Sequence, residues 1–154
     1  MVLTERQLQL DPANISIDKK QQQIISSELI HIESGLYEVG SDNRERSYDN
    51  ERPSHTKQIA SFTISSLPVS NREYKQFMED GGYSKKEYWS ETAWTWINKN
   101  AFKHPHHWRS NNKPDYYGID HSGIFSLEDN QPVYGLSHHE AAAYANWKGM
   151  RLPH

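Results

Sequence analysis

The chain has 154 residues, the length of a single domain, and carries a net charge of −3 at pH 7 with both signs intermixed. Because no basic stripe is available to neutralise phosphates, the sequence argues against a nucleic-acid partner. No apolar run approaches the roughly 20 residues that span a bilayer, and no signal-peptide pattern opens the chain. We therefore expect a cytoplasmic protein with no membrane partner.

The amino-acid composition restricts both the core and the chemistry. Cysteine is absent, which excludes disulfides, thiolate nucleophiles and thiolate metal ligands. Apolar residues make up only 34% of the chain, yet it contains five Trp and nine Tyr. We therefore expect large rings with polar atoms to build most of the core.

Residues 1–27 are polar, contain "DKKQQQ" and are predicted to form a linker or arm. Order is expected from residue 28 onward. The stretch "ELIHIESGLYEVGS" (28–41) predicts a β-hairpin that turns at Ser34-Gly35. A polar loop then leads into a strand whose inward positions are predicted to be Ile59, Phe62 and Ile64.

Two helices carry clear start and stop signals, which makes the domain α+β. In "PVSNREYKQFMEDGGY" (68–83), Ser70 and Glu73 have capping-box spacing, and Gly81-Gly82 ends the helix. The apolar face of this helix is predicted to be Tyr74, Phe77 and Met78.

The second helix lies in "LSHHEAAAYANWKGMRLPH" (136–154), with Ser137 and Glu140 as capping partners and Gly149 as the stop. Its inward positions are predicted to be Ala141, Tyr144, Ala145 and Trp147. His138 and His139 beside Glu140 could instead form a catalytic cluster. The capping spacing already explains the glutamate, so we favour an ordinary helix start.

Residues 84–131 are rich in Trp, Tyr, His, Asn and Pro and show little periodicity. We expect a functional or extended binding loop, with short helices in "SKKEYWSETAWTWINKN" (84–100). Four tryptophans could stack a small ligand, although a place in the core is the favoured reading. They are Trp89, Trp94, Trp96 and Trp108.

The stretch "KHPHHW" offers His104, His106 and His107 as candidate metal ligands, to which Asp120 or His121 could add. Adjacent histidines in an extended loop point to opposite sides, so at most two would share a metal, and a solvated loop is favoured. The stretch "DNERPSH" (49–55) is read as a turn with an internal ion pair rather than an active site.

Several blocks in order carry a family resemblance: "LIHIESGLYEVGS", "DNERPSH", "FTISSLPVSNREYKQFMEDGGY", "YWSETAWTW" and "PVYGLSHHEAAAYANWKGMRLP". Residues 28–153 resemble the sulfatase-modifying-factor, or formylglycine-generating-enzyme-like, domain. The copy in ergothioneine-forming sulfoxide synthases is the most similar. The resemblance implies a C-type-lectin-like α+β fold with much irregular structure.

The resemblance also defines what this chain lacks. In the family the "RLP" block usually continues into a further helix and a second half, so residues 28–154 are expected to be the amino-terminal part of the domain. The copper-binding cysteine pair of formylglycine-generating enzymes has no counterpart. The helical domain through which sulfoxide synthases hold non-haem iron is missing too. We therefore expect no cofactor in this chain.

Three functional hypotheses follow. The first is a partial domain, not catalytic alone, of an oxygen-dependent oxidoreductase, completed by a partner chain that supplies the rest and acting on a small-molecule substrate. The second is a non-enzymatic C-type-lectin-like module that displays residues 84–131 to a ligand or protein. The third is an independent metal enzyme built on the histidine loop.

Overall fold

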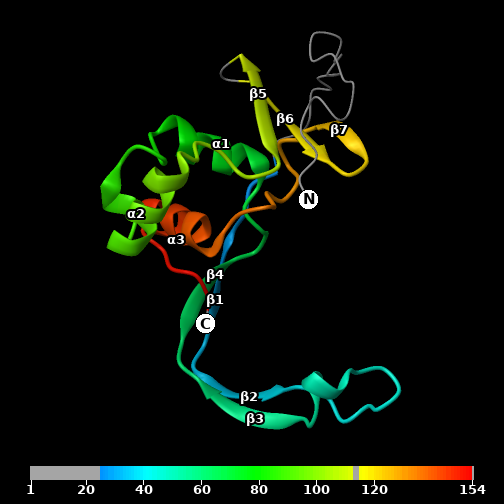
Figure 1. The fold of residues 1–154 in the computed structure, drawn as a ribbon. Helices are drawn as coiled ribbons and strands as arrows, with labels where there is room; N and C mark the ends of the chain where they lie inside the picture. Colours follow the sequence, from blue (N-terminus) through cyan, green and yellow to red (C-terminus); the bar gives the residue numbers. More distant parts are fainter. Residues whose placement is uncertain (1–24, 113–114, 154) are drawn as a thin grey trace. The chain divides into compact units, whose positions relative to one another are not determined.

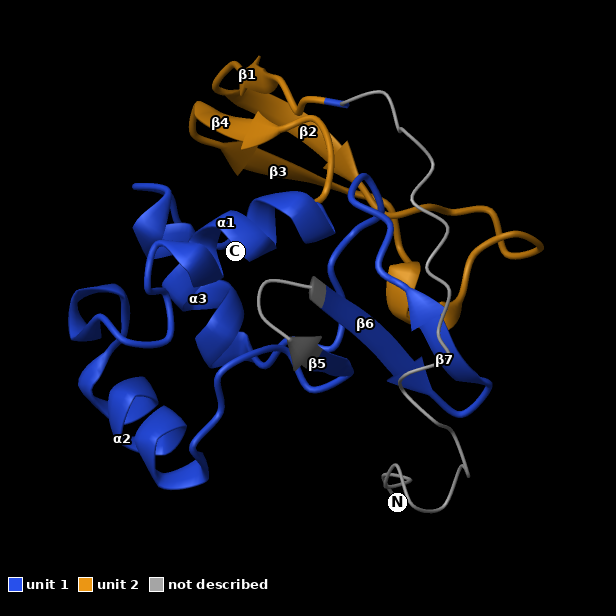
Figure 2. Ribbon diagram, turned by 90° about the horizontal axis from the view of Figure 1, so that it is seen from above, with its two compact units in different colours: residues 1–25, 69–154 blue, residues 26–68 orange. Residues whose placement is uncertain are grey.

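The computed structural model describes residues 25–112 and 115–153, and these form an α+β protein as predicted. The chain divides into two compact units, shown in different colours in Figure 2. Unit 1 comprises residues 1–25 and 69–154, and unit 2 comprises residues 26–68. None of the helices in the described ranges is long and apolar enough to cross a membrane.

Unit 2 is built from four short strands and one short 3-10 helix (Figure 1). They are β1 (Leu29–Ile32), β2 (Gly35–Val39), η3 (Asp49–Glu51), β3 (His55–Ile59) and β4 (Phe62–Ser65). The predicted hairpin between residues 29–32 and 35–39 is wrong, because β1 pairs antiparallel with β4 and β2 with β3. In both ladders the numbers of the two paired residues add up to 94, as in Leu29–Ser65 and Gly35–Ile59. The two ladders are therefore one antiparallel ribbon that keeps the same register on both sides of a break.

The ribbon of unit 2 has an open apolar face. Ile30 lies opposite Ile64, and Ile32 lies opposite Phe62. Since alternate residues of a strand point to the same side, these four side chains share one face. Ile30 is 45% exposed and Ile64, which was expected to point inward, is 39% exposed. The ribbon therefore leaves much of its apolar surface in contact with water.

Unit 1 contains three α-helices and a further 3-10 turn. They are α1 (Asn71–Glu79), η4 (Lys86–Tyr88), α2 (Glu91–Asn100) and α3 (His138–Trp147). The predicted start of α1 is confirmed, because Ser70 Oγ accepts from the Glu73 backbone N–H and the Glu73 carboxylate accepts from the Ser70 N–H. Gly81 has φ +84° and Gly149 has φ +68°, which confirms both predicted helix stops.

A three-stranded antiparallel sheet completes unit 1, in the order β5-β6-β7 (Figure 1). The strands are β5 (Trp108–Asn112), β6 (Asp115–Asp120) and β7 (Gly123–Ser126). The expectation of an irregular loop over residues 84–131 is therefore wrong for residues 108–126, which form this sheet. The short helices expected in residues 84–100 are present as η4 and α2. The strands escaped detection because they are short and rich in polar and aromatic residues, without clear alternation.

The core of unit 1 is aromatic, as its composition predicted. Tyr74 and Phe77 of α1 have no exposed surface, and Trp108 at the start of β5 is 1% exposed. The Tyr74 ring stacks on Tyr144 of α3 at 5.7 Å and meets Trp108 edge-on at 6.1 Å. Phe77 meets Tyr144 edge-on at 5.8 Å. Such geometries add about 0.5–1.5 kcal/mol per pair to the gain from burial.

The arm predicted for residues 1–27 falls mainly on residues 1–24, which are outside the described residues, and it stays a prediction. The predicted boundary at residue 28 also stays a prediction.

Phe77 provides a test of the aromatic core. We expect Phe77→Ala to lower the free energy of unfolding of the full chain by about 3–5 kcal/mol, because the cavity removes contacts with several rings. Phe102→Ala is the matched control: Phe102 is 41% exposed and packs on Trp96, so its loss should cost about 1 kcal/mol or less. Urea unfolding monitored by tryptophan fluorescence measures both. Equal losses would contradict the proposed location of the core.

Candidate functional site

Glu140, in the first turn of α3, is a buried carboxylate that is only 4% exposed. Its Oε2 atom accepts hydrogen bonds from the backbone N–H and the hydroxyl of Ser137, both at 2.8 Å. Ser137 Oγ accepts from the Glu140 backbone N–H at 3.2 Å. The predicted capping box is therefore confirmed, and it satisfies one carboxylate oxygen.

The other carboxylate oxygen of Glu140 belongs to a buried hydrogen-bond chain. Tyr83 donates its hydroxyl proton to Glu140 Oε1 at 2.5 Å, and the Tyr74 and Tyr83 hydroxyls lie 3.1 Å apart. Because Tyr83 has a single proton and gives it to the carboxylate, Tyr74 is the donor to Tyr83. The chain Tyr74–Tyr83–Glu140 thus joins α1 to the start of α3.

The electrostatics of this chain keep both phenols protonated. Burial raises the pKa of Tyr83 far above its ordinary value, and the neighbouring Tyr74 and Glu140 raise it further. Burial also raises the pKa of Tyr74. The two hydroxyls therefore act as fixed hydrogen-bond donors around a buried negative charge.

The four candidate tryptophans lie in or against the core. Trp89 is 6% and Trp108 is 1% exposed, and both belong to the buried cluster. Trp89 also donates its indole N–H to the Gly82 carbonyl at 2.7 Å. Trp94 and Trp96 are half-buried and pack against the same cluster. Their predicted role in ligand binding stays a prediction.

The candidate metal ligands His104, His106 and His107 lie in a turn rather than in an extended loop. In consequence, the rings of His106 and His107 do not point to opposite sides but stack at 5.3 Å, with 13° between their planes. His107 Nδ1 lies 3.3 Å from the Ile119 carbonyl, and His104 Nδ1 lies 3.0 Å from the Pro105 carbonyl. Among the side chains that the structure describes, no three from His, Cys, Asp or Glu form a group that could hold a metal ion. The metal role of these histidines stays a prediction.

His138 and His139 do not join a catalytic group with Glu140. His138 is exposed, and His139 packs its ring against Trp96 at 5.3 Å. The carboxylate of Glu140 is occupied by Ser137 and Tyr83 instead. The ordinary helix start is therefore confirmed, and the catalytic alternative stays a hypothesis.

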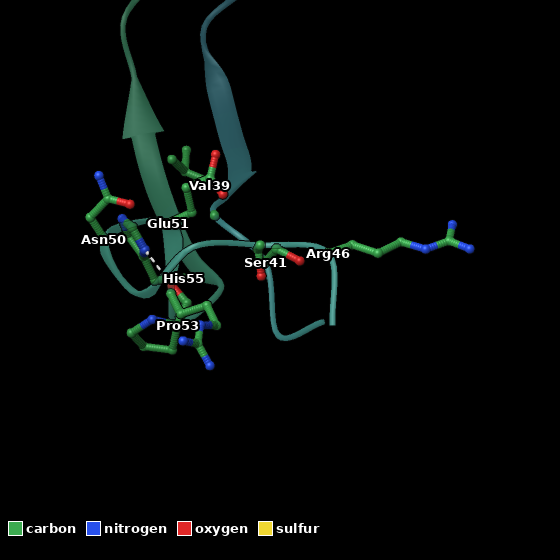
Figure 3. Close-up of a pocket in the computed structure, with 10 residues that line it drawn as sticks. Val39, Ser41, Arg46, Asn50, Glu51, Pro53 and His55 are labelled. Atoms are coloured by element: carbon green, nitrogen blue, oxygen red, sulfur yellow. Dashed lines mark hydrogen bonds between the residues drawn. The ribbon is translucent and has the colours of Figure 1, made fainter. Parts of the chain in front are cut away.

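A wide hollow of about 610 Å³ lies in unit 2, in the loop between β2 and β3 (Figure 3). The loop is held by Tyr48, whose N–H donates to the Glu51 carboxylate at 2.8 Å and whose carbonyl accepts from Arg52 Nε at 3.2 Å. The turn predicted for residues 49–55 is therefore confirmed. The ion pair predicted in this stretch is absent: among the described residues, no carboxylate lies within 4 Å of the Arg52 or His55 side-chain nitrogens. Arg46 also lines the hollow, and the end of its side chain points away from the other labelled residues (Figure 3).

A second, smaller hollow of about 190 Å³ lies in unit 1, beside the hairpin of β6 and β7. Its wall includes Phe125 and Tyr134, whose rings stack at 6.1 Å, and its rim includes Asp120. Sequence reasoning did not single out Phe125 or Tyr134. Asp120 was considered only as an additional metal ligand.

Comparison with known proteins identifies the family. Residues 15–154 match the sulfatase-modifying factor enzyme 1-like domain. The chain belongs to this family. The match covers both described units, so the resemblance noted from sequence blocks is confirmed.

Individual relatives refine this assignment. The chain is 38% identical over 110 residues to the hercynine oxygenase of Mycobacterium tuberculosis, which covers 70% of this chain and 24% of that protein. It is 35% identical over 124 residues to the hercynine oxygenase of Mycolicibacterium smegmatis, covering 79% of this chain and 28% of that protein. The mouse formylglycine-generating enzyme is 26% identical over 145 residues, covering 82% of this chain and 37% of that protein. The chain thus spans about a quarter of the length of these hercynine oxygenases.

The buried tyrosines give a pH-dependent prediction. A tyrosine whose pKa is raised in the folded state contributes its full stability below the unfolded value of about 10, and that stability is lost as pH rises above it. Tyr83→Phe should lower the free energy of unfolding by about 1–3 kcal/mol at pH 8, because Glu140 loses a hydrogen-bond donor. Above pH 10 the free energy of unfolding of this variant should fall less steeply than that of the parent protein. The slopes should differ by about 1.4 kcal/mol per pH unit.

Urea unfolding of the full chain at several pH values between 8 and 11 measures both effects. Tyr48→Phe is the matched control, because Tyr48 is 78% exposed and its replacement should leave the free energy of unfolding at pH 8 unchanged. Parallel curves for Tyr83→Phe and the parent would show that Tyr83 is not buried with its proton.

Proposed function

We propose that this chain forms the scaffold portion of an oxygen-dependent oxidoreductase of the hercynine oxygenase type, and that it is not catalytic alone. Sequence identity of 33% to 38% with three hercynine oxygenases supports the first part of this proposal. The chain accounts for only 24% to 28% of their length, so most of each relative lies outside the aligned region. In this proposal, segments corresponding to that remainder supply the reactive centre.

The observation that carries the second part is the open apolar face of unit 2. A two-stranded ribbon is marginally stable in water unless another element covers it. Beyond Ile30 and Ile64, the ribbon also exposes Leu36 of β2 by 71%. Apolar surface of this kind marks a contact with further protein. We assign that contact to the remaining part of the same domain, contributed by this polypeptide or by a partner chain.

We assign no step of the reaction to a metal held by this chain. Iron is the cofactor that the resemblance to sulfoxide synthases implies, and the described residues form no group that could hold it. Copper binding through a cysteine pair does not fit either, because the sequence has no cysteine. The part assigned to this chain is to build the aromatic core of the domain and to offer a surface on which the reactive part assembles. The substrate in this proposal is a small molecule of the hercynine class.

Measuring oxygen consumption tests whether the chain is catalytic alone. The purified chain, supplied with ferrous iron, hercynine and a small thiol, should consume oxygen no faster than the same mixture without protein. The hercynine oxygenase of Mycobacterium tuberculosis serves as a positive control under the same conditions. Chain-dependent turnover that a chelator abolishes would contradict the statement that the chain is not catalytic alone.

The open face of the ribbon can be tested separately. Replacing the cross-strand pair by threonine (Ile30→Thr with Ile64→Thr) should lower binding of the dye ANS and reduce concentration-dependent association, because the apolar face becomes polar. The matched control changes the pair on the opposite face, His31→Gln with Thr63→Ser, and should leave both readouts unchanged. Dye binding that is the same in all three proteins would show that the face is already covered.

A further inference from the structure

The smaller hollow of unit 1 combines an aromatic wall with an acidic rim. The wall is formed by Phe125 of β7 and by Tyr134, which is 46% exposed. We call Asp120, Ser122 and Gln131, which line the same hollow, its rim. All of these residues belong to unit 1 and lie in described parts of the chain.

The aromatic wall is held in place by its neighbours. Phe125 lies opposite Gly118 in the β6–β7 ladder, and its ring occupies the space that a side chain at Gly118 would fill. Tyr134 contacts Phe125, at 6.1 Å, and the ring of His107, at 5.8 Å, and still keeps 46% of its surface exposed. The His107 ring in turn fills the space beside Gly135. The wall is therefore a fixed surface with one ring, Tyr134, turned to water.

The Asp120 carboxylate at the rim carries a negative charge that no described cation neutralises. Asp120 Oδ1 accepts the Ser122 backbone N–H at 2.7 Å, which fixes the carboxylate at the tip of the hairpin. Among the described residues, no Lys, Arg or His nitrogen lies within 4 Å of this carboxylate. The negative charge of Asp120 also acts on Tyr134. Burial is the main cause that raises the pKa of Tyr134, and Asp120 raises it further. A carboxylate and an aromatic face thus border the same small space.

We infer that this hollow is a binding site for a guanidinium group. A guanidinium is planar and cationic, so it can stack on the Tyr134 face while donating hydrogen bonds to the Asp120 carboxylate. The Ser122 hydroxyl and the Gln131 side-chain carbonyl oxygen can accept its remaining N–H groups. An anion is disfavoured by Asp120, and the volume of about 190 Å³ suits a single small group. This site is separate from the apolar face of unit 2 and does not depend on the function proposed above.

The geometry also predicts the strength and selectivity of binding. A stacked cation at an exposed aromatic ring contributes about 0.5–1 kcal/mol, and a hydrogen bond to a charged group about 1.5–3 kcal/mol. Because these contributions are small, we expect a Kd in the millimolar range. Removing the positive charge at constant shape should weaken binding about tenfold.

The test is an NMR titration of the 15N-labelled full chain with N-acetyl-L-arginine amide. Its neutral isostere, N-acetyl-L-citrulline amide, is the matched control ligand. We expect saturable shifts centred on Gly123, Ile124 and Phe125 with the arginine compound and about tenfold weaker binding of the citrulline compound. Equal affinities, or shifts centred elsewhere, would overturn the inference.

Two variants test the groups that carry the site. Asp120→Asn keeps an oxygen for the Ser122 N–H but removes the charge, and Tyr134→Leu keeps apolar bulk but removes the ring. Each should weaken arginine binding at least fivefold. Their controls are Asp129→Asn, which removes an exposed carboxylate paired with Lys75, and Tyr48→Leu, which removes an exposed ring in unit 2. Unchanged binding by Asp120→Asn, with a native spectrum, would overturn the assignment.

A third ligand distinguishes the source of the guanidinium. Agmatine represents a free small guanidine, whereas the capped arginine represents a residue within a peptide. Tighter binding of agmatine identifies a small-molecule ligand, and tighter binding of the capped residue identifies an arginine of a polypeptide partner. Both results uphold the guanidinium assignment. Failure of both ligands to bind overturns it.

Discussion

The architecture of unit 1 depends on how the protein satisfies one buried carboxylate. Glu140 would be costly inside the protein if either of its oxygens lacked a donor. One oxygen accepts a hydrogen bond from Ser137, the cap of α3. The other accepts a hydrogen bond from the Tyr83 hydroxyl, which is itself hydrogen-bonded to Tyr74. A single side chain therefore fixes the beginning of one helix relative to the middle of another.

The aromatic core extends from this hydrogen-bond chain. Tyr74 is both the terminal donor of the chain and the ring around which Phe77, Trp108 and Tyr144 pack. A core with few aliphatic side chains needs such rings to be oriented, because their hydroxyl groups must find partners when buried. Unit 2 has no comparable centre, and its ribbon exposes the apolar residues that a further layer would cover. This difference is why we assign a scaffold role to the chain and place the reactive centre in other segments.

Local chemistry explains which parts of the structure were predictable from the sequence. The starts and stops of α1 and α3 follow from Ser-x-x-Glu spacing and from glycines with positive φ, and both depend on a few neighbouring residues. The partner of β1 was not predictable in this way, because a break at Ser34 and a tight hairpin turn look alike in sequence, whereas strand pairing is a long-range choice. The burial of Glu140 was missed for a related reason. The capping spacing accounts for one oxygen and says nothing of Tyr83, 57 residues away. The site beside β7 was missed because its parts come from separate segments, and the family resemblance adds no information on it.

Hydrogen exchange of the full chain, followed residue by residue, tests the central claim that unit 1 sustains its own core while the ribbon of unit 2 lacks cover. The account predicts slow exchange for the backbone amides of α1, α3 and the β5–β6 ladder, at rates set by global unfolding. It predicts exchange of the β1–β4 and β2–β3 amides faster by at least about a hundredfold, through local opening. Ribbon amides protected as strongly as those of α1 would contradict the account.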